Sequence, residues 1–293
     1  MVNVKCESRN NLCENNLFDY AAGGVAGWGT YQATRATLRR PYARYFNDCI
    51  SQISEAENKK LWDAANDVFA SSNLASKNIS MKDLSKVNAE NFANETLAKA
   101  NLSSRPRKKI WYYLFGETKA EKLKKHLKVV GDGGNACYIP WTKTVAVNGE
   151  KMGFSAFHEM GHSLNHTGKG IGNFLHKIRH KSALVAPFIL AYSLLANKKD
   201  NAISFDDKFG NFVKDNTGTL MFACMIPTLM EEGLASVKGA KLAKSKLSKD
   251  LYNKMCKSYT KAWGTYAIGA VAMGLCGAFA VHIRDRIVGN KKT

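Results

Sequence analysis

The apolar positions of this chain are most densely clustered near its end. Residues 262–283 contain no Asp, Glu, Lys or Arg and a single histidine, His282, and the basic residues Lys261 and Arg284 flank them. At 1.5 Å per residue, a helix of this length spans the hydrocarbon core of a bilayer, which is about 30 Å thick. The run also contains small residues of the kind that let membrane helices pack closely, namely Gly264, Gly269, Gly274 and Gly277. We therefore predict a transmembrane helix over residues 262–283.

Two shorter apolar runs, residues 183–196 and 217–230, each contain a proline. Both are shorter than the roughly 17–25 residues of a membrane span, so they fit core helices, re-entrant segments or a tight hairpin. The segment that joins them has balanced charge, whereas the chain on either side of the pair is strongly basic. Under the positive-inside rule, this asymmetry predicts that the flanking chain lies on the cytoplasmic side.

The first part of the chain follows helical patterns. Residues 17–33 are rich in glycine and alanine, but they include an aspartate and precede three arginines, which favours an interfacial helix over a membrane span. Apolar residues from Ile50 to Phe69 predict one amphipathic helix, and a second one contains residues 123–127. Residues 71–104 are rich in Asn, Ser, Lys and Ala, and they predict loop and short helix.

A β pattern appears in the middle of the chain. Residues 138–141 and 143–147 are rich in aromatic and β-branched residues and are broken by Pro140. The pair Asn148-Gly149 then signals a turn, and a helical pattern of apolar residues follows until Gly168. The fold class predicted from these patterns is α+β, mostly helical, with a short β-sheet and added apolar helices.

The helix expected before Gly168 contains the motif His-Glu-Met-Gly-His at residues 158–162. Residues four apart lie on one helical face, with roughly 5–6 Å between their Cβ atoms, so His158 and His162 can converge on one metal ion. Glu159 lies beside them and can take a proton from a water activated by the metal. HExxH on a helix is a signature of zinc hydrolases, so the motif predicts Zn²⁺ as cofactor. An exposed helix that matches the pattern by chance is the alternative.

The strand pair followed by the HExxH helix resembles the zincin metalloprotease fold, in which the strand nearest the helix aligns extended peptide substrates. The resemblance implies that residues 135–141 form the substrate-side edge. Catalytic zinc usually takes three protein ligands. The metzincin pattern would place the third histidine where this chain has Gly168, so that pattern does not apply. His166 lies about 12 Å along a straight helix from His158, and we interpret it as a supporting or surface residue.

The glutamate-zincins use a carboxylate from a second helix as the third ligand. Glu232, followed by Ala235 and Ser236, resembles the E-x-x-A-[DS] signature of that family. The resemblance implies that His158, His162 and Glu232 bind Zn²⁺, and Glu231 is the alternative ligand. A solvated helix end is the other interpretation of two adjacent glutamates.

The order of HExxH, an apolar hairpin and a glutamate helix resembles integral-membrane zinc endopeptidases of the HtpX and CaaX-prenyl-protease type. It implies a zincin-like core that cleaves peptide or protein substrates, with Glu159 as the residue that activates water. Tyr138 is a candidate for stabilising the oxyanion. Those enzymes begin with clear transmembrane helices, whereas the first 130 residues of this chain offer only the stretch 17–33.

The net charge indicates which molecules the protein binds, and the cysteines indicate whether it has disulfides or a cysteine metal site. The net charge of +19 comes mainly from lysine clusters that border apolar segments, and such a field attracts anionic partners. Because no nucleic-acid-binding motif accompanies the clusters, we expect an anionic membrane surface and no nucleic acid as partner. A basic-aromatic patch at residues 105–113 is expected to rest on the same surface. The seven cysteines are odd in number and lack a CxxC pair, which indicates neither a disulfide framework nor a cysteine zinc site.

The patterns predict three parts of the chain. Residues 1–130 are predicted to form a helical N-terminal region with an interfacial helix at 17–33. Residues 131–260 are predicted to form a zincin-like catalytic domain with an apolar hairpin at 183–230. Residues 261–293 are predicted to form a transmembrane helix with a basic tail. The predicted function is that of a membrane-associated zinc metallopeptidase, an endopeptidase whose zinc site faces the cytoplasm. The alternatives are a catalytically inactive zincin-like module for membrane interaction or lipid binding, and a basic nucleic-acid-binding protein.

Overall fold

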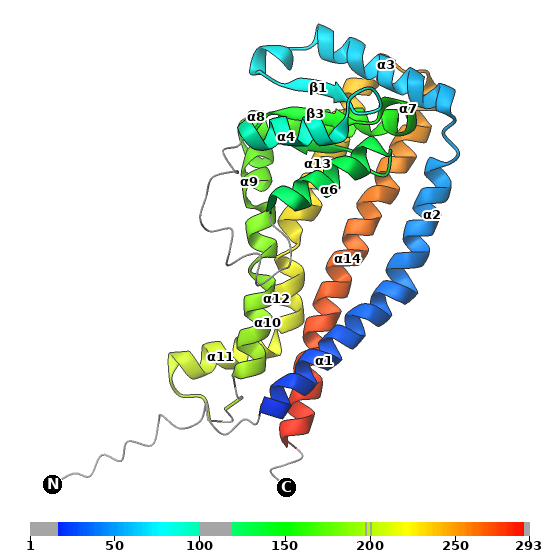
Figure 1. Ribbon diagram of the computed structural model, residues 1–293. Coiled ribbons are helices and arrows are strands. Elements are labelled where there is room, and N and C mark those ends of the chain that lie inside the picture. The colour runs from blue at the N-terminus through cyan, green and yellow to red at the C-terminus, as the bar shows by residue number, and fades with distance from the viewer. Residues whose placement is uncertain (1–16, 100–118, 197, 200, 290–293) are drawn as a thin grey trace, which may run out of the picture. The chain divides into compact units, whose positions relative to one another are not determined.

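The computed structural model describes residues 17–99, 119–196, 198–199 and 201–289 (Figure 1). In these residues the chain is mostly helical with a small three-stranded mixed sheet, as the sequence predicted. The chain divides into two compact units. Unit 1 comprises Met1–Phe46, Lys177–Leu229 and Ala262–Thr293, and unit 2 comprises Asn47–His176 and Met230–Lys261.

The sheet belongs to unit 2 and has the strand order β1-β3-β2. Strand β2 (Cys137–Ile139) pairs antiparallel with β3 (Thr144–Val147), and both strands were predicted. Strand β1 (Ser80–Asp83) pairs in parallel with β3 and lies in a segment that was predicted as loop and short helix. Its four residues lack a β pattern of their own, so pairing with a strand distant in sequence decides their conformation.

The side chains of β3 are all buried and serve both faces of the sheet. Val145 and Val147 belong to a core that they share with residues of α3 (Glu55–Ser71) and α8 (Ala156–Thr167). Ala146 belongs to a second core with residues of α4 and α6, which cover the other face (Figure 1). The bounds of these two helices are Ala89–Lys99 and Lys119–Gly131. Two helical layers therefore hold the sheet, and with it the strand edge near α8.

Helix α3 begins later than the sequence pattern predicted. One helix was expected from Ile50 to Phe69, but α2 (Arg40–Ile50) ends and α3 starts at Glu55. Ser54 caps α3: its hydroxyl accepts a hydrogen bond from the N–H of Glu57, and the Glu57 carboxylate accepts one from the N–H of Ser54. This capping box satisfies two backbone donors, so the helix can start there.

The HExxH helix follows a short capped turn. The side chain of Asn148 accepts hydrogen bonds from the N–H groups of Glu150 and Lys151 in α7 (Gly149–Met152), in agreement with the predicted turn. One turn of 3-10 helix, η3 (Gly153–Ser155), separates α7 from α8, which begins at Ala156. Helix α8 ends at Gly168, as predicted, and the motif therefore lies on one uninterrupted helix.

The remaining elements complete both units. Helices α9 (Ile171–Ala183), α13 (Ile226–Ala243) and α14 (Lys249–Gly289) contribute residues to each unit. The short 3-10 helix η2 (Ala75–Lys77) belongs to unit 2. Unit 1 further contains α1 (Leu17–Thr34), the π-helical turn η1 (Arg35–Arg39), α10 (Ala186–Leu195), α11 (Phe205–Asp215) and α12 (Thr217–Ala223).

The helices of unit 1 meet through small residues. A Cβ atom on Gly27 of α1 would lie 2.8 Å from the Cβ atom of Ala280 in α14. A Cβ atom on Gly218 of α12 would lie 2.7 Å from the backbone oxygen of Gly274, also in α14. Both distances are too short for a larger side chain, so these glycines allow the helix backbones to approach one another.

Two helical stretches among the described residues are long and apolar enough to cross a membrane, namely Thr217–Ala243 and Lys249–Ile287. The span predicted at residues 262–283 lies within the second stretch. The run at 217–230, which is too short for a span by itself, forms the beginning of the first. The length and composition of these two stretches thus agree with a membrane location.

The predicted division into parts 1–130, 131–260 and 261–293 stays a prediction, as does the interfacial role of residues 17–33, which form α1. The basic-aromatic patch at 105–113 lies outside the described residues.

Candidate metal centre

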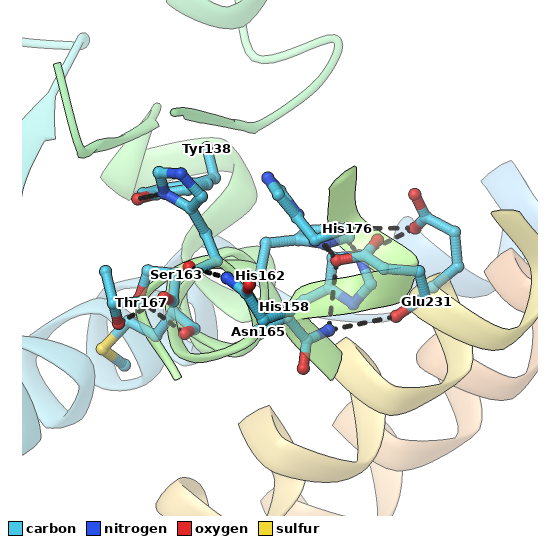
Figure 2. A network of polar contacts seen from close by, with 12 residues as sticks. Tyr138, His158, His162, Ser163, Asn165, Thr167, His176 and Glu231 are labelled. Carbon is cyan, nitrogen blue, oxygen red and sulfur yellow. Dashed lines mark hydrogen bonds and ion pairs between the residues drawn. The ribbon is translucent and has the colours of Figure 1, made fainter. Parts of the chain in front are cut away.

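Helix α8 brings the two histidines of the motif together in unit 2. The Nε2 atoms of His158 and His162 lie 3.1 Å apart, and the two rings are nearly perpendicular, with centroids 4.6 Å apart. Figure 2 shows both imidazoles on the same side of the helix. The helical spacing of four residues therefore produces the convergence that the sequence predicted.

Helix α13 adds a carboxylate to this pair. The Oε2 atom of Glu232, which is buried, lies 3.3 Å from Nε2 of His158 and 3.4 Å from Nε2 of His162. The three atoms form a nearly equilateral triangle. Ligands that bind Zn²⁺ tetrahedrally at about 2.0–2.1 Å are separated from one another by about 3.3–3.4 Å, so the triangle has the size of three zinc ligands.

Glycines on both helices permit this approach. A Cβ atom on Gly161, inside the HExxH motif, would overlap the backbone oxygen of Ala235 in α13. A Cβ atom on Gly239 of α13 would overlap the backbone oxygen of Phe157 in α8. The two helices therefore touch backbone to backbone, which places Glu232 within reach of both histidines.

The other ring nitrogen of each histidine has its own partner. Nδ1 of His162 lies 2.9 Å from Oε1 of Glu231, and Nδ1 of His158 lies 3.1 Å from the hydroxyl of Ser236. The carboxylate of Glu231 can only accept, so His162 donates through Nδ1, and when the ring is neutral its Nε2 carries a lone pair towards the triangle. Such partners fix the tautomer and orientation of metal-binding histidines.

Glu231 is completely buried and collects further donors. Its Oε1 atom also accepts hydrogen bonds from Nδ1 of His176 in α9 at 3.0 Å and from Nδ2 of Asn165 at 3.1 Å (Figure 2). The contacts of Glu231 with His162 thus involve Nδ1, the nitrogen that faces away from the triangle. Sequence reasoning missed His176 and the role of Asn165, because neither residue lies in a recognisable motif.

Charge around His162 is strongly negative. Burial lowers the pKa of His162, but hydrogen bonds with Glu231 and Glu232, together with the charges of Glu232 and Glu159, raise it to about 10. The carboxylates therefore favour a positive charge at this point, which a proton or a metal cation can supply.

Glu159 is buried at the edge of the same group. One of its carboxylate oxygens and the ligand atoms of His158 and His162 all lie within 4.8 Å of one another. Burial raises the pKa of the Cys137 thiol in β2, and the negative charge of Glu159 adds to this effect. Glu159 is thus close enough to act electrostatically both on the histidine pair and on the edge strand.

Tyr138 and His166 form a separate pair next to the cluster. The hydroxyl of Tyr138 lies 2.8 Å from Nδ1 of His166, and burial raises the pKa of the tyrosine (Figure 2). The ring centroid of His166 lies 4.9 Å from that of His176. His166 is therefore a supporting residue that contacts β2, in line with its sequence interpretation, and the oxyanion role of Tyr138 stays a prediction.

The histidine and glutamate side chains of this cluster could hold a metal ion, and within the described part of the chain two overlapping groups have suitable spacing. The first comprises His158, Glu159 and His162, and the second comprises His162, His176 and Glu231. Comparison of the chain with models of known protein families, with curated proteins and with solved structures finds no match.

Proposed function

We propose that this protein is a membrane-associated zinc metallopeptidase in which His158, His162 and Glu232 bind Zn²⁺. The observation that carries the proposal is the triangle of Nε2, Nε2 and Oε2 atoms with edges of 3.1, 3.3 and 3.4 Å. When both histidines are neutral and carry their proton on Nδ1, lone pairs on all three atoms face one another, and a cation between them relieves that repulsion. Two imidazoles and a carboxylate are the ligands of many catalytic zinc sites, which keep a further position for water.

Glu159 is the proposed general base. Zinc bound at the triangle would lower the pKa of a water molecule and polarise the carbonyl of the scissile bond. The carboxylate of Glu159 lies within 4.8 Å of the histidine ligand atoms, so it can accept the proton that the attacking water releases. It can then return that proton to the leaving amine of the cleaved peptide.

Strand β2 is the proposed binding edge for an extended peptide or protein substrate. Among the described strands, β2 pairs with β3 on one side only, so its other side can accept a further strand. A substrate added there would gain backbone hydrogen bonds whatever its sequence. The electrostatic influence of Glu159 on Cys137 supports a location of this edge beside the catalytic carboxylate.

The surface of unit 1 supports membrane insertion. In the part of α14 from 262 to 283, several large apolar residues, including Val271, Leu275 and Phe279, are exposed, whereas small residues such as Ala270 and Ala280 are buried. A soluble helix shows the opposite distribution, because water drives large apolar side chains inside. We propose that the segment at 262–283 spans a bilayer, that anionic lipid faces the basic flanks, and that the zinc site lies on the cytoplasmic side.

The sequence resemblance adds the enzyme class. Together with HExxH and Glu232, the membrane location supports a glutamate-zincin endopeptidase similar to the HtpX and CaaX-prenyl-protease type. Glu231, the alternative ligand, is proposed instead to orient His162, because its Oε1 atom contacts Nδ1 rather than Nε2.

The decisive experiment measures peptide cleavage and bound zinc in the full-length protein and in Glu159→Gln. Loss of the general base should reduce cleavage by about 10²–10⁴-fold while the zinc content stays near that of the unaltered protein. Glu150→Gln, which changes an exposed carboxylate of α7, should leave both quantities unchanged. Equal cleavage by Glu159→Gln would refute the mechanism. An unaltered protein that binds zinc but cleaves nothing would instead favour the inactive zincin-like module.

A further inference from the structure

Helix α11 of unit 1 exposes an unusual apolar face. Phe205, Phe209 and Phe212 are 78%, 50% and 53% exposed, and they lie within about 60° of one another around the helix axis. Ile203, just before the helix, is 85% exposed. The rings of Phe205 and Phe209 stack with centroids 6.2 Å apart, so the face is a continuous aromatic surface.

Two polar residues of α11, Asn211 and Lys214, are held by the rest of unit 1. The Lys214 side chain is almost completely buried, and its Nζ atom donates to Oδ1 of Asp285 at 2.6 Å and to the carbonyl oxygen of Ala196 at 2.9 Å. The side chain of Asn211 exchanges two hydrogen bonds with the backbone of Lys199. Helix α11 thus turns these two polar side chains, together with Val213, towards the protein and its three aromatic rings away from it.

This orientation is opposite to that of a helix on a water-soluble protein. In water, the apolar face packs against the core and the polar face is solvated, because burial of apolar surface is favourable. The fixed polar contacts prevent α11 from rotating its phenylalanines inwards. The aromatic face therefore requires an apolar neighbour outside unit 1.

We propose that α11 lies in the plane of a membrane surface, with Phe205, Phe209 and Phe212 inserted at the boundary of headgroups and acyl chains. The inference rests on the proposed membrane location of unit 1. Continuity of the apolar surface favours lipid as the neighbour: the ring of Tyr192 in α10 lies 6.3 Å from that of Phe209, and Phe188 of α10 is 74% exposed. Aromatic rings and amphipathic helices both prefer this interfacial layer.

The charge of α11 determines how it recognises lipid. Its eleven residues contain three aspartates and two lysines, so the helix has no excess of positive charge. Insertion is consequently driven by the aromatic face and not by attraction to acidic headgroups. Helix α11 should insert equally well into zwitterionic and anionic bilayers, unlike a basic surface segment.

The test uses full-length protein in phosphatidylcholine nanodiscs with an environment-sensitive fluorescent amino acid in place of Phe209. Nitroxide-labelled lipids should quench this probe, about twofold more strongly from a label near the carbonyl groups than from one at the chain end, since interfacial helices reach only about 5–10 Å deep. The same probe in place of Asp207, which lies about 160° from Phe209 around the helix axis and pairs with Lys199 of unit 1, should be quenched little. Adding phosphatidylglycerol should not change either result.

Three outcomes would overturn the inference. The first is equal quenching at positions 207 and 209, and the second is quenching at 209 that requires phosphatidylglycerol. The third is a blue shift at 209 that depends on protein concentration without quenching by lipid, which would assign the face to a second copy of the chain. A probe in place of Leu275 of α14 separates this failure from that of the membrane proposal. Quenching at 275 but not at 209 rejects only the role of α11, whereas no quenching at either position rejects insertion of unit 1.

Discussion

The backbone of Gly161 in α8 touches the carbonyl oxygen of Ala235 in α13 so closely that a Cβ atom has no room between them. Gly161 lies between Glu159 and His162, and Ala235 lies one helical turn after Glu232. The residues proposed to bind and use zinc are therefore positioned by a direct contact of two helix backbones.

Gly161→Ala should damage both stability and metal binding. The added methyl group would force α8 and α13 apart, at a cost of about 1–3 kcal/mol for overpacking, and would move Glu232 away from the histidines. Thermal unfolding and zinc titration would detect the two effects. Gly269→Ala is the matched control, because a Cβ atom at Gly269 has no atom within 4 Å. Zinc affinity unchanged in Gly161→Ala would contradict the importance of the contact.

Replacement of the two adjacent glutamates should have different effects. Glu232→Gln should lose stoichiometric zinc, since its Oε2 atom is the carboxylate oxygen facing both Nε2 atoms. Glu231→Gln should retain zinc with affinity weakened by about 10–100-fold, the usual effect of removing a partner that orients a ligand. Zinc titration of both purified variants provides the measurement. If Glu231→Gln loses zinc and Glu232→Gln retains it, Glu231 is the ligand.

His176→Phe tests whether α9 supports the site through Glu231. The substitution removes the hydrogen bond at 3.0 Å from Nδ1 of His176 to Oε1 of Glu231, while an aromatic ring still fills the space. We expect a smaller loss of zinc affinity than in Glu231→Gln, because His162 and Asn165 still donate to the same oxygen. A complete loss of zinc in a folded His176→Phe protein would instead make His176 a ligand.

Removal of zinc should destabilise the protein. A ligand that binds only the folded state adds about 2.7 kcal/mol at a free concentration 100 times its dissociation constant. A chelator should therefore lower the melting temperature, and added zinc should restore it. The variant His158→Ala should melt at the same temperature with and without zinc. If neither the chelator nor added zinc changes the melting temperature of the unaltered protein, the protein has no stabilising metal site.

The carboxylate of Glu57, which lies in the first turn of α3, should make the stability of the protein depend on pH in the acid range. A hydrogen bond from Lys254 is the largest cause that lowers the pKa of Glu57, from its ordinary value near 4.5 to about 2, and the backbone of Ser54 adds to the shift. Because the folded-state pKa is depressed, this stabilisation is complete above about pH 4.5 and is lost as the pH falls towards 2. Glu57→Gln should be less stable at pH 6, and its difference from the unaltered protein should shrink between pH 4.5 and 2. Thermal melts across this range are the measurement, with Glu55→Gln in the same helical turn as control.

The sequence by itself determined those features that depend on neighbours along the chain. The i, i+4 spacing places His158 and His162 on one face of any regular helix, and Nε2 atoms 3.1 Å apart are its consequence. Long apolar segments and the strand pattern at 138–147 are equally local, because they reflect the period and length of single elements. The turn at Asn148 and the end at Gly168 also follow from local backbone chemistry.

Only the tertiary structure decided which distant residues meet. Strand β1 exists because it pairs with β3. The two glutamates differ because α13 places Glu231 at Nδ1 of His162 and Glu232 at the Nε2 atoms of both motif histidines. His176 lies in no sequence motif, and the packing of α9 brings it to Glu231. The phenylalanines of α11 are exposed because polar contacts hold the opposite side of that helix against the protein. These outcomes depend on long-range packing and on burial, which the order of residues along one helix does not specify.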